Sequence, residues 1–292
     1  MMQIRRLVKS GAASHTIALP KEWVVKNNLK KGDLLYITEE KNELVISSQG
    51  KKPSPKIKEI QIAVDSKGIN TIRRQAISAY INNYHIFIFH GNSLNKKLED
   101  IRKILDNFLA LEIIEQTATK LIAKDFLNLQ EFSLTNTIRR MDMLARSIIS
   151  DSKKGKKEYD ALYFRDFEID KLFFLVSRLI RSNLADPACS FSNVKALSAW
   201  WLAKNLESIA DAAKNISRHF SSEIDGVYNE IEQYYLECIK SYFKNDKETA
   251  DALIDKRIEI IEKCDKFKQK YLLKELVDHS RNIAKIVLDS ED

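Results

Sequence analysis

The chain has 292 residues, of which 44% are hydrophobic and 30% are charged, a composition that excludes a disordered protein. Three scattered cysteines without a CxxC pair exclude a disulfide framework and a thiolate metal site. With no signal peptide and no run of about 20 apolar residues, we expect a cytoplasmic protein without membrane insertion. The net charge of +7 lies within residues 1–58, which hold twelve Lys/Arg and five Asp/Glu, and this favours a nucleic-acid partner.

Residues 1–50 are predicted to form a small β module. Apolar residues and turns predict strands at 4–8 and 16–19, a helix at 21–27, and a hairpin of strands at 34–38 and 43–47. Pro20 stands at the first position of the helix, where its missing N–H is not needed. Four short strands and one short helix bury too little apolar surface to be stable alone, so we expect a homodimer.

This module resembles the SpoVT/AbrB swapped-hairpin DNA-binding family in its KSG turn, in ALPKEW and in LKKGDLLYI. The resemblance implies that two chains interleave their hairpins into one β barrel, whose basic strands and loops contact double-stranded DNA. It assigns DNA contacts first to Arg5, Arg6 and Lys9, and then to His15 and Lys21.

One departure from that family concerns how DNA would be read. Many members have an arginine directly after the Ser-Gly of the turn, whereas this chain has Ala12 and Ala13. The remaining basic residues can bind phosphates, which positions a protein on DNA without reading its sequence. In the alternative interpretation, the same charges only protect a strand edge from aggregation.

Residues 51–58 are predicted to be an extended linker, because they contain two prolines and four lysines. Residues 59–130 form the next predicted domain, an α+β spacer. Its expected elements are strands at 60–64, 85–90, 112–115 and 120–123 and helices at 68–81 and 94–108. The spacer has no GxGxxG and no phosphate-loop motif.

Residues 131–292 have a helical period throughout and few helix breakers. The expected helices are at 133–152, 157–184, 191–219, 222–244, 247–270 and 272–289. Six helices of this length form two three-helix bundles in tandem. A repeat supports this duplication, since ESIADAAKNIS from Glu207 is echoed by KELVDHSRNIA from Lys274.

Acidic residues recur at the same places in the two repeats. Residues four apart share one helix face, so the pairs Asp166 with Asp170 and Glu207 with Asp211 would place four carboxylates between facing helices. Oxygen ligands of this kind suit Mg²⁺, Ca²⁺, Mn²⁺ or ferric iron, and zinc is less diagnostic. The helical pattern places the site open and near the surface. A weaker second set is Asp255, Glu259 and Asp278.

Two considerations count against metal binding. In the second repeat, Lys274 stands where the first has Glu207, and an ammonium group there disfavours a cation. In the alternative interpretation, the carboxylates lie on a solvated helix surface and form ion pairs that contribute little to stability. The basic residues available for such pairs are Arg165, Lys171, Lys204 and Lys214.

The helical region resembles the PhoU family of phosphate-uptake regulators in TIRRMDMLARSII, RDFEIDKLFFLVSRLI and LESIADAAKNIS with its partial repeat. The resemblance implies two three-helix bundles that bind metal clusters through their acidic pairs. It also implies a role in restraining a phosphate ABC transporter and its signalling kinase. The whole chain then resembles an archaeal-type regulator of mostly α, multidomain α+β class, with a β-barrel head at 1–50, a spacer at 59–130 and paired bundles at 131–292.

We expect a DNA-binding regulator of phosphate homeostasis, whose helical body senses a metal ion, the phosphate state or a partner. The alternative is an adaptor that dimerises through residues 1–50 and restrains a phosphate transporter ATPase or its sensor kinase without binding DNA. An enzyme is not expected, because no Ser-His-Asp set, HExxH motif or organic-cofactor motif is legible. A metal-dependent enzyme would use the carboxylates to activate water, and the sequence shows no general base for it.

Overall fold

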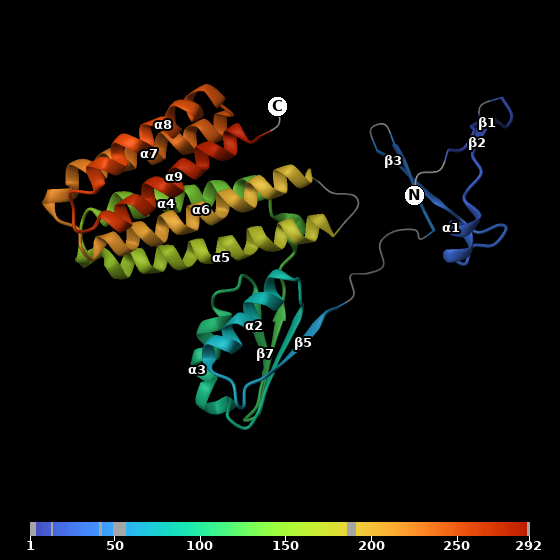
Figure 1. The fold of residues 1–292 in the computed structure, drawn as a ribbon. Coiled ribbons are helices and arrows are strands. Elements are labelled where there is room, and N and C mark those ends of the chain that lie inside the picture. Colours follow the sequence, from blue (N-terminus) through green and yellow to red (C-terminus); the bar gives the residue numbers. More distant parts are fainter. Residues whose placement is uncertain (1–3, 13, 41–42, 49–56, 186–190, 291–292) are drawn as a thin grey trace. The chain divides into compact units, whose positions relative to one another are not determined.

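The computed structural model describes residues 4–12, 14–40, 43–48, 57–185 and 191–290. It divides into two compact units, residues 1–56 and 57–292. Residues 51–56 of the predicted linker lie outside the described residues. The first unit contains small β hairpins, and the second contains a small mixed sheet and a large helical part (Figure 1). The predicted fold class, a mostly α multidomain protein, is confirmed.

Two separate hairpins and one short helix form the first unit. β1 (Val8–Lys9) pairs antiparallel with β2 (His15–Thr16), α1 spans Lys21–Lys26, and β3 (Tyr36–Glu40) pairs antiparallel with β4 (Glu43–Ser47). Gly11 has a φ of +84° in the turn between β1 and β2, a conformation that glycine adopts without strain. The first two strands are shorter than predicted, because among the described residues of one chain 4–7 and 17–19 have no strand to pair with.

No side chain is buried among the described residues of the first unit. Large apolar side chains that a core would normally cover are open to solvent, from 39% exposed for Val45 to 83% for Ile4. They come from every part of the unit, and they are Ile4, Leu7, Val8, Ile17, Val25, Leu34, Tyr36, Ile37, Leu44 and Val45. Exposed apolar surface of this extent marks an interaction surface.

The second unit begins with a four-stranded sheet and two helices. The elements are β5 (Glu59–Ala63), α2 (Ile69–Ile81), β6 (Ile86–His90), α3 (Leu94–Leu105), β7 (Leu111–Gln116) and β8 (Lys120–Asp125). The strand order is β5-β6-β8-β7, with β5 and β6 parallel and the other neighbours antiparallel. Alternating strand residues such as Phe87 and Phe89 share one buried core with Ile72 and Ile101 from the helices. The predicted order of elements is confirmed.

Six long helices make up the rest of the second unit. They are α4 (Leu134–Ser152), α5 (Tyr159–Leu184), α6 (Asn193–Ser217), α7 (Asp225–Lys244), α8 (Lys247–Cys264) and α9 (Lys270–Leu288). α4, α5 and α6 pack against one another, as do α7, α8 and α9, and α6 packs along α9 to join the two bundles (Figure 1). One hydrophobic core runs through all six. The six predicted helices are confirmed, although α8 ends at Cys264 rather than at 270.

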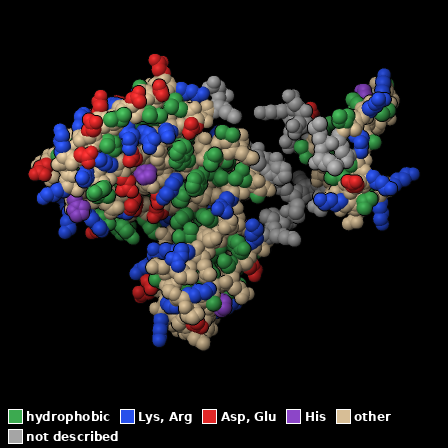
Figure 2. Space-filling model, viewed as in Figure 1, with side chains coloured by type: hydrophobic (Ala, Val, Ile, Leu, Met, Phe, Trp, Pro, Cys, Tyr) green, Lys and Arg blue, Asp and Glu red, His purple; other side chains and the backbone are tan. Residues whose placement is uncertain are grey.

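The surface of the second unit carries charges of both signs. Residues 59–292 contain as many Lys/Arg as Asp/Glu, and Figure 2 shows both kinds intermingled across the face in view. None of the described helices is long and apolar enough to cross a membrane.

Helix α5 packs on both parts of the second unit. Its Phe173 packs on the helical core, and the neighbouring Phe174 packs on the core of the α/β part. Arg178 is 1% exposed, donates from Nη2 to Asp125 Oδ2 at 2.6 Å, and lies 4.3 Å over the ring of Tyr80. Removing one partner of such a pair would leave a buried unpaired charge at a cost of about 3–5 kcal/mol. The helix that carries the first acidic pair is therefore anchored to the α/β part.

Candidate functional site

The five residues predicted to contact DNA all lie in the first unit, and all are exposed. Arg5 and Arg6 precede β1, and Lys21 begins α1. Lys9 of β1 stands opposite His15 of β2, and directly opposed residues project from the same face of a hairpin. The structure therefore brings two of the five together and places the other three on adjoining segments.

The turn between β1 and β2 carries no charge of its own. It is closed by a hydrogen bond from Ser10 N to Ser14 O at 2.9 Å. Ala12 lies in this turn, and Ala13 lies outside the described residues. The basic residues of this hairpin therefore lie on the segments beside the turn.

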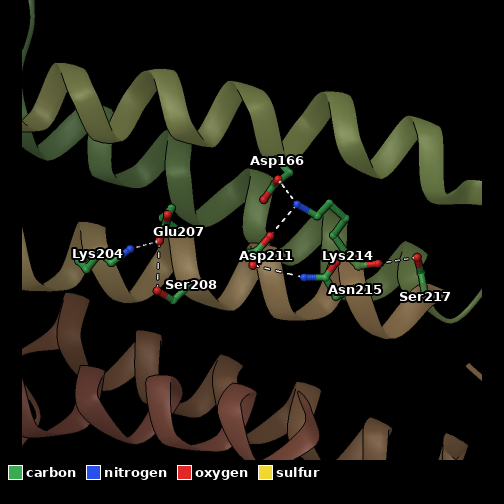
Figure 3. Close-up of polar contacts among 8 residues, drawn as sticks. All are labelled: Asp166, Lys204, Glu207, Ser208, Asp211, Lys214, Asn215 and Ser217. Atoms are coloured by element: carbon green, nitrogen blue, oxygen red, sulfur yellow. Dashed lines mark hydrogen bonds and ion pairs between the residues drawn. The ribbon is translucent and has the colours of Figure 1, made fainter. Parts of the chain in front are cut away.

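The first acidic set comprises Asp166 and Asp170 of α5 and Glu207 and Asp211 of α6. A lysine of α6 lies between Asp166 and Asp211 (Figure 3). Lys214 Nζ donates to Asp166 Oδ2 at 2.5 Å and to Asp211 Oδ1 at 2.6 Å. Asp166 and Lys214 are only 6% and 7% exposed, whereas Asp211 is open to solvent. The prediction of an open site is therefore wrong for Asp166, because the close packing of α5 on α6 covers it.

Glu207 lies one turn before Asp211 on α6 and has partners of its own (Figure 3). Its Oε2 accepts hydrogen bonds from Lys204 Nζ at 2.6 Å and from Ser208 Oγ at 3.1 Å. Both partners come from α6 itself. This carboxylate is thus held along its own helix, while Asp211 shares a lysine with the facing helix.

The other two basic residues named as ion-pair partners serve different carboxylates. Arg165 pairs with Asp151 at 2.5 Å, and Lys171 pairs with Glu168 at 3.0 Å. Among the described residues, the lysines that pair with the first acidic set are therefore Lys204 and Lys214 of α6. The ion-pair interpretation is correct for part of this set: the Lys214–Asp166 pair is buried, whereas Lys204 and Asp211 are open to solvent.

Asp170 is half-buried, and no described residue donates a hydrogen bond to its carboxyl group. Burial, followed by the negative charges of Asp166 and Glu207, raises the pKa of Asp170 from 3.8 to about 7. Burial alone would lower the pKa of Lys214, but its hydrogen bonds to Asp166 and Asp211 raise that pKa above the ordinary value. The surroundings therefore favour the protonated, neutral form of Asp170 and the charged form of Lys214.

The donor set has the chemistry of a hard-cation site, because carboxylate oxygens are the ligands that such ions prefer. Asp166 Oδ1 is buried with no hydrogen-bond partner among the described residues, so one ligand oxygen is available. Lys214 already places a positive charge between Asp166 and Asp211. No three His, Cys, Asp or Glu side chains of the described residues converge on one point that could hold an ion. A metal ion would have to displace the ammonium group, and metal binding stays a prediction.

The second acidic set is arranged differently. Asp278 Oδ1 accepts a hydrogen bond from Arg257 Nε at 2.5 Å. Asp255 and Glu259, the counterparts of the buried pair on α5, are exposed on α8. An arginine of the facing helix thus neutralises one of the three carboxylates, and the other two face solvent.

Two segments of the chain match known families. Residues 11–56 match the family model described as antidote-toxin recognition MazE, bacterial antitoxin, and residues 138–220 match the PhoU domain. The chain therefore joins a segment similar to MazE/AbrB-like domains to a segment similar to the PhoU domain. Both predicted resemblances are confirmed. No curated protein and no solved structure matches the chain.

The two matches cover the candidate residues unequally. The PhoU match begins within α4 and ends after α6, so it contains most of the first bundle and all four carboxylates of the first acidic set. The MazE/AbrB-like match begins at Gly11. It includes His15 and Lys21, and it begins after Arg5, Arg6 and Lys9.

Sequence reasoning missed the central place of Lys214 and the burial of Arg178. Lys214 follows Asp211 by three residues, and that spacing signals an ion pair on one helix. Its reach to Asp166 depends on how α5 packs on α6. Arg178 stands alone among apolar residues in LFFLVSRLI, and a lone charge in such a run signals a buried ion pair.

Proposed function

We propose that this chain is a homodimeric DNA-binding regulator of phosphate homeostasis. The MazE/AbrB-like segment holds DNA, and the PhoU-like body senses a cation, the phosphate state or a protein partner. Both matched domain types are regulatory rather than catalytic, which supports a regulator over an enzyme. A transporter ATPase or a sensor kinase is the kind of protein partner that the PhoU domain suggests.

One observation carries the dimer and the DNA assignment together: the first unit has exposed positive charge and no buried side chain among its described residues. Burying apolar surface stabilises a structure by about 25 cal/mol per Å², so the ten exposed apolar side chains favour pairing with a second copy. Residues 1–50 hold eight Lys/Arg and five Asp/Glu. A dimer doubles this positive charge on one small barrel.

The charge supports a particular mode of DNA binding. Phosphate contacts supply affinity without sequence information, and each contact lowers the affinity as salt is added, with a slope of about −0.9 per phosphate. The uncharged Ala12 in the turn is in keeping with this mode. Lysines 51, 52, 56 and 58 of the linker sequence would add further contacts with the backbone.

The test is binding of the full chain to a fluorescent DNA duplex, measured by anisotropy at several salt concentrations. The double variant Arg5→Ala/Arg6→Ala is expected to bind at least tenfold more weakly and to show a salt slope about 2 lower. Lys30→Ala/Lys31→Ala removes the same charge from another exposed part of the first unit and serves as the matched control. Equal losses in the two variants, or none in either, would remove the assignment of Arg5 and Arg6.

The adaptor alternative gives a different result in the same experiment. A wild-type chain that is dimeric by light scattering, yet binds no duplex even at low salt, would be an adaptor that dimerises through its first unit. Capture of a transporter ATPase or a sensor kinase on the full chain would then identify what it restrains. Duplex binding that is lost on monomerisation supports the regulator.

The sensing role of the body is assigned to the first acidic set. A divalent cation held by Asp166, Asp170, Glu207 and Asp211 would neutralise the like charges between α5 and α6, which Lys214 does in this structure. The orphaned buried Oδ1 of Asp166 supports this assignment. Burial of two of the carboxylates also makes an unneutralised state costly.

Calorimetric titration of the full chain with Mn²⁺ tests the assignment. Lys214→Gln removes the competing ammonium and is expected to tighten Mn²⁺ binding at least tenfold. Asp166→Asn/Asp211→Asn is expected to abolish binding. Asp255→Asn/Glu259→Gln likewise neutralises two carboxylates, here of the second acidic set, and should bind as the wild type does. Mn²⁺ binding unchanged by all three variants would place the cation elsewhere.

A further inference from the structure

We infer that the helical part contains a second ligand site, a cavity that takes a small organic anion. The cavity has a volume of about 640 Å³, within the range of roughly 300–1,000 Å³ typical of small-molecule sites. It lies at the end of the helical part where α4 and α6 begin and α7 and α9 end (Figure 1). Residues of both three-helix bundles therefore line it.

This cavity is distinct from the acidic set. Lys195 at its rim and Asp211 of the acidic set are sixteen residues apart on α6, which corresponds to roughly 24 Å of helix. No acidic residue lines the cavity among the described residues. A ligand here would not share side chains with a cation bound between α5 and α6.

The interior of the cavity is apolar and partly aromatic. Leu134 and Ile138 of α4, with Ile286 and Val287 of α9, are buried core residues that face it. Tyr242 and Phe243 of α7 line it as well. A hydrophobic or aromatic body would gain apolar burial here, at about 25 cal/mol per Å².

The charged side chains that line the cavity among the described residues are both basic. Arg139 and Lys195 are exposed, and neither forms an ion pair with a described residue. The Arg139 guanidinium lies 4.4 Å from the centre of the Phe243 ring, which holds it over the aromatic wall by a cation–π contact. Hydroxyl groups of Ser192 and Ser198 add donors at the same edge.

The helix ends around the cavity add to this polarity. α4 and α6 both begin here, and the N-terminus of a helix favours negative charge. α7 and α9 end at the same place, and their last turns are closed by backbone bonds such as Asp246 N to Ser241 O at 3.0 Å and Asp289 N to Lys285 O at 3.0 Å. Ser133 Oγ accepts from Asn136 N and Ser192 Oγ accepts from Lys195 N, so one N–H group at each N-terminus is already capped. The negative ends of α7 and α9 oppose the positive ends of α4 and α6, so the basic side chains of Arg139 and Lys195 set the sign of the site.

These features together define the ligand class: one carboxylate, phosphate or sulfonate group on an apolar or aromatic body. The anionic group would lie between Arg139 and Lys195, and the body would lie against Tyr242 and Phe243. Because residues from both bundles line the cavity, a bound ligand would stabilise their packing. The inference is independent of DNA binding and of the cation assignment.

The probe for the test is 8-anilinonaphthalene-1-sulfonate, an aromatic body with one anionic group, titrated into the full chain and followed by fluorescence. The wild type is expected to show a saturable phase. Arg139→Gln/Lys195→Gln should weaken that phase at least tenfold, because two charge-assisted contacts are lost. Arg73→Gln/Lys96→Gln removes the same charge from exposed positions of the α/β part and should leave the phase unchanged.

Two further measurements separate the contribution of the anionic group to binding from that of the apolar body. The neutral probe N-phenyl-1-naphthylamine lacks the sulfonate, so its affinity should be the same for the wild type and the Arg139→Gln/Lys195→Gln variant. Ser198→Phe fills the cavity and should remove binding of both probes, with its fold checked by circular dichroism. Binding of the sulfonate probe that is the same in the rim variant as in the wild type would overturn the inference, whether or not Ser198→Phe folds.

Discussion

The two three-helix bundles share a repeat but neutralise its acidic residue in different ways. In the first bundle, Asp211 is neutralised by Lys214 from its own helix, and that lysine also reaches Asp166 on the facing helix. In the second bundle, the equivalent Asp278 is neutralised by Arg257 from the facing helix. Arg281, which stands at the position of Lys214, has a buried Nε without a hydrogen-bond partner among the described residues.

This difference decides where the remaining carboxylates lie. A lysine that reaches across from α6 can satisfy a buried Asp166, so the acidic pair of α5 lies at the packed interface. With Arg257 supplied from α8 itself, no buried acid is needed there, and Asp255 and Glu259 lie at the surface. Duplication of a helix pair therefore preserves the fold without preserving the charged site, because the neutralising basic residue comes from a different helix in each bundle.

Removing the ammonium group of Lys214 is expected to have the largest effect on stability. Lys214→Met leaves Asp166 buried without its ammonium partner, and breaking a buried pair typically costs about 3–5 kcal/mol. Urea unfolding of the full chain at pH 7, in the presence of a chelator, measures the loss. A loss below about 1 kcal/mol would show that the two bundles do not differ in this respect.

The substitution Asp170→Asn is expected to have a large effect of opposite sign, an increase in stability. The pKa of Asp170 is about 7 in the folded state, against an ordinary value of 3.8. Between about pH 4 and pH 7 the unfolded state therefore releases this proton more readily than the folded state does. The free energy of unfolding of the wild type falls over this pH range as a result. The asparagine variant lacks this loss. The variant should equal the wild type near pH 4 and be more stable at pH 8 by about 2–4 kcal/mol.

The measurement is the free energy of unfolding of both proteins at pH 4, 6 and 8 without divalent ions. Glu259→Gln makes a comparable change at the corresponding, exposed position of the second bundle. It should show no such dependence on pH. An advantage of Asp170→Asn that is constant with pH would contradict the assignment.

A smaller loss is expected from Arg257→Met in the second bundle. The side chains of Arg257 and Asp278 are 31% and 40% exposed, so water screens the charge that is left, and the free energy of unfolding should fall by about 1 kcal/mol or less. Thermal unfolding of Arg257→Met and Lys214→Met, measured under the same conditions, compares the two losses directly. Equal losses in the two variants would mean that both bundles depend on their ion pair to the same degree.

The smallest effect is expected from the double variant Asp255→Asn/Glu259→Gln. Both side chains face solvent, and substitutions at such positions typically change stability by less than about 0.5 kcal/mol. Denaturant unfolding should give a midpoint close to that of the wild type. A loss of several kcal/mol would show that the second acidic set is used in folding after all.

Much of the fold could be predicted from the amino-acid sequence, because it depends on local periodicity. Alternating apolar residues placed the strands, helical periods placed the six long helices, and Pro20 marked where α1 begins. The duplicated ADxxxNI-type ending, from Asp211 and from Asp278, indicated the tandem bundles. The first two strands were predicted to be longer than they are, since residues 4–7 and 17–19 have no strand to pair with among the described residues of one chain.

Tertiary packing decided which charges meet. The sequence by itself determined that acidic residues recur four apart and that basic residues lie nearby, since spacing along a helix places side chains on a face. It did not determine that Lys214 bridges α5 and α6, or that Arg178 is buried against Asp125, because such contacts join residues far apart in the chain. Burial depends on the helix that covers a side chain, and that is a property of the folded structure alone.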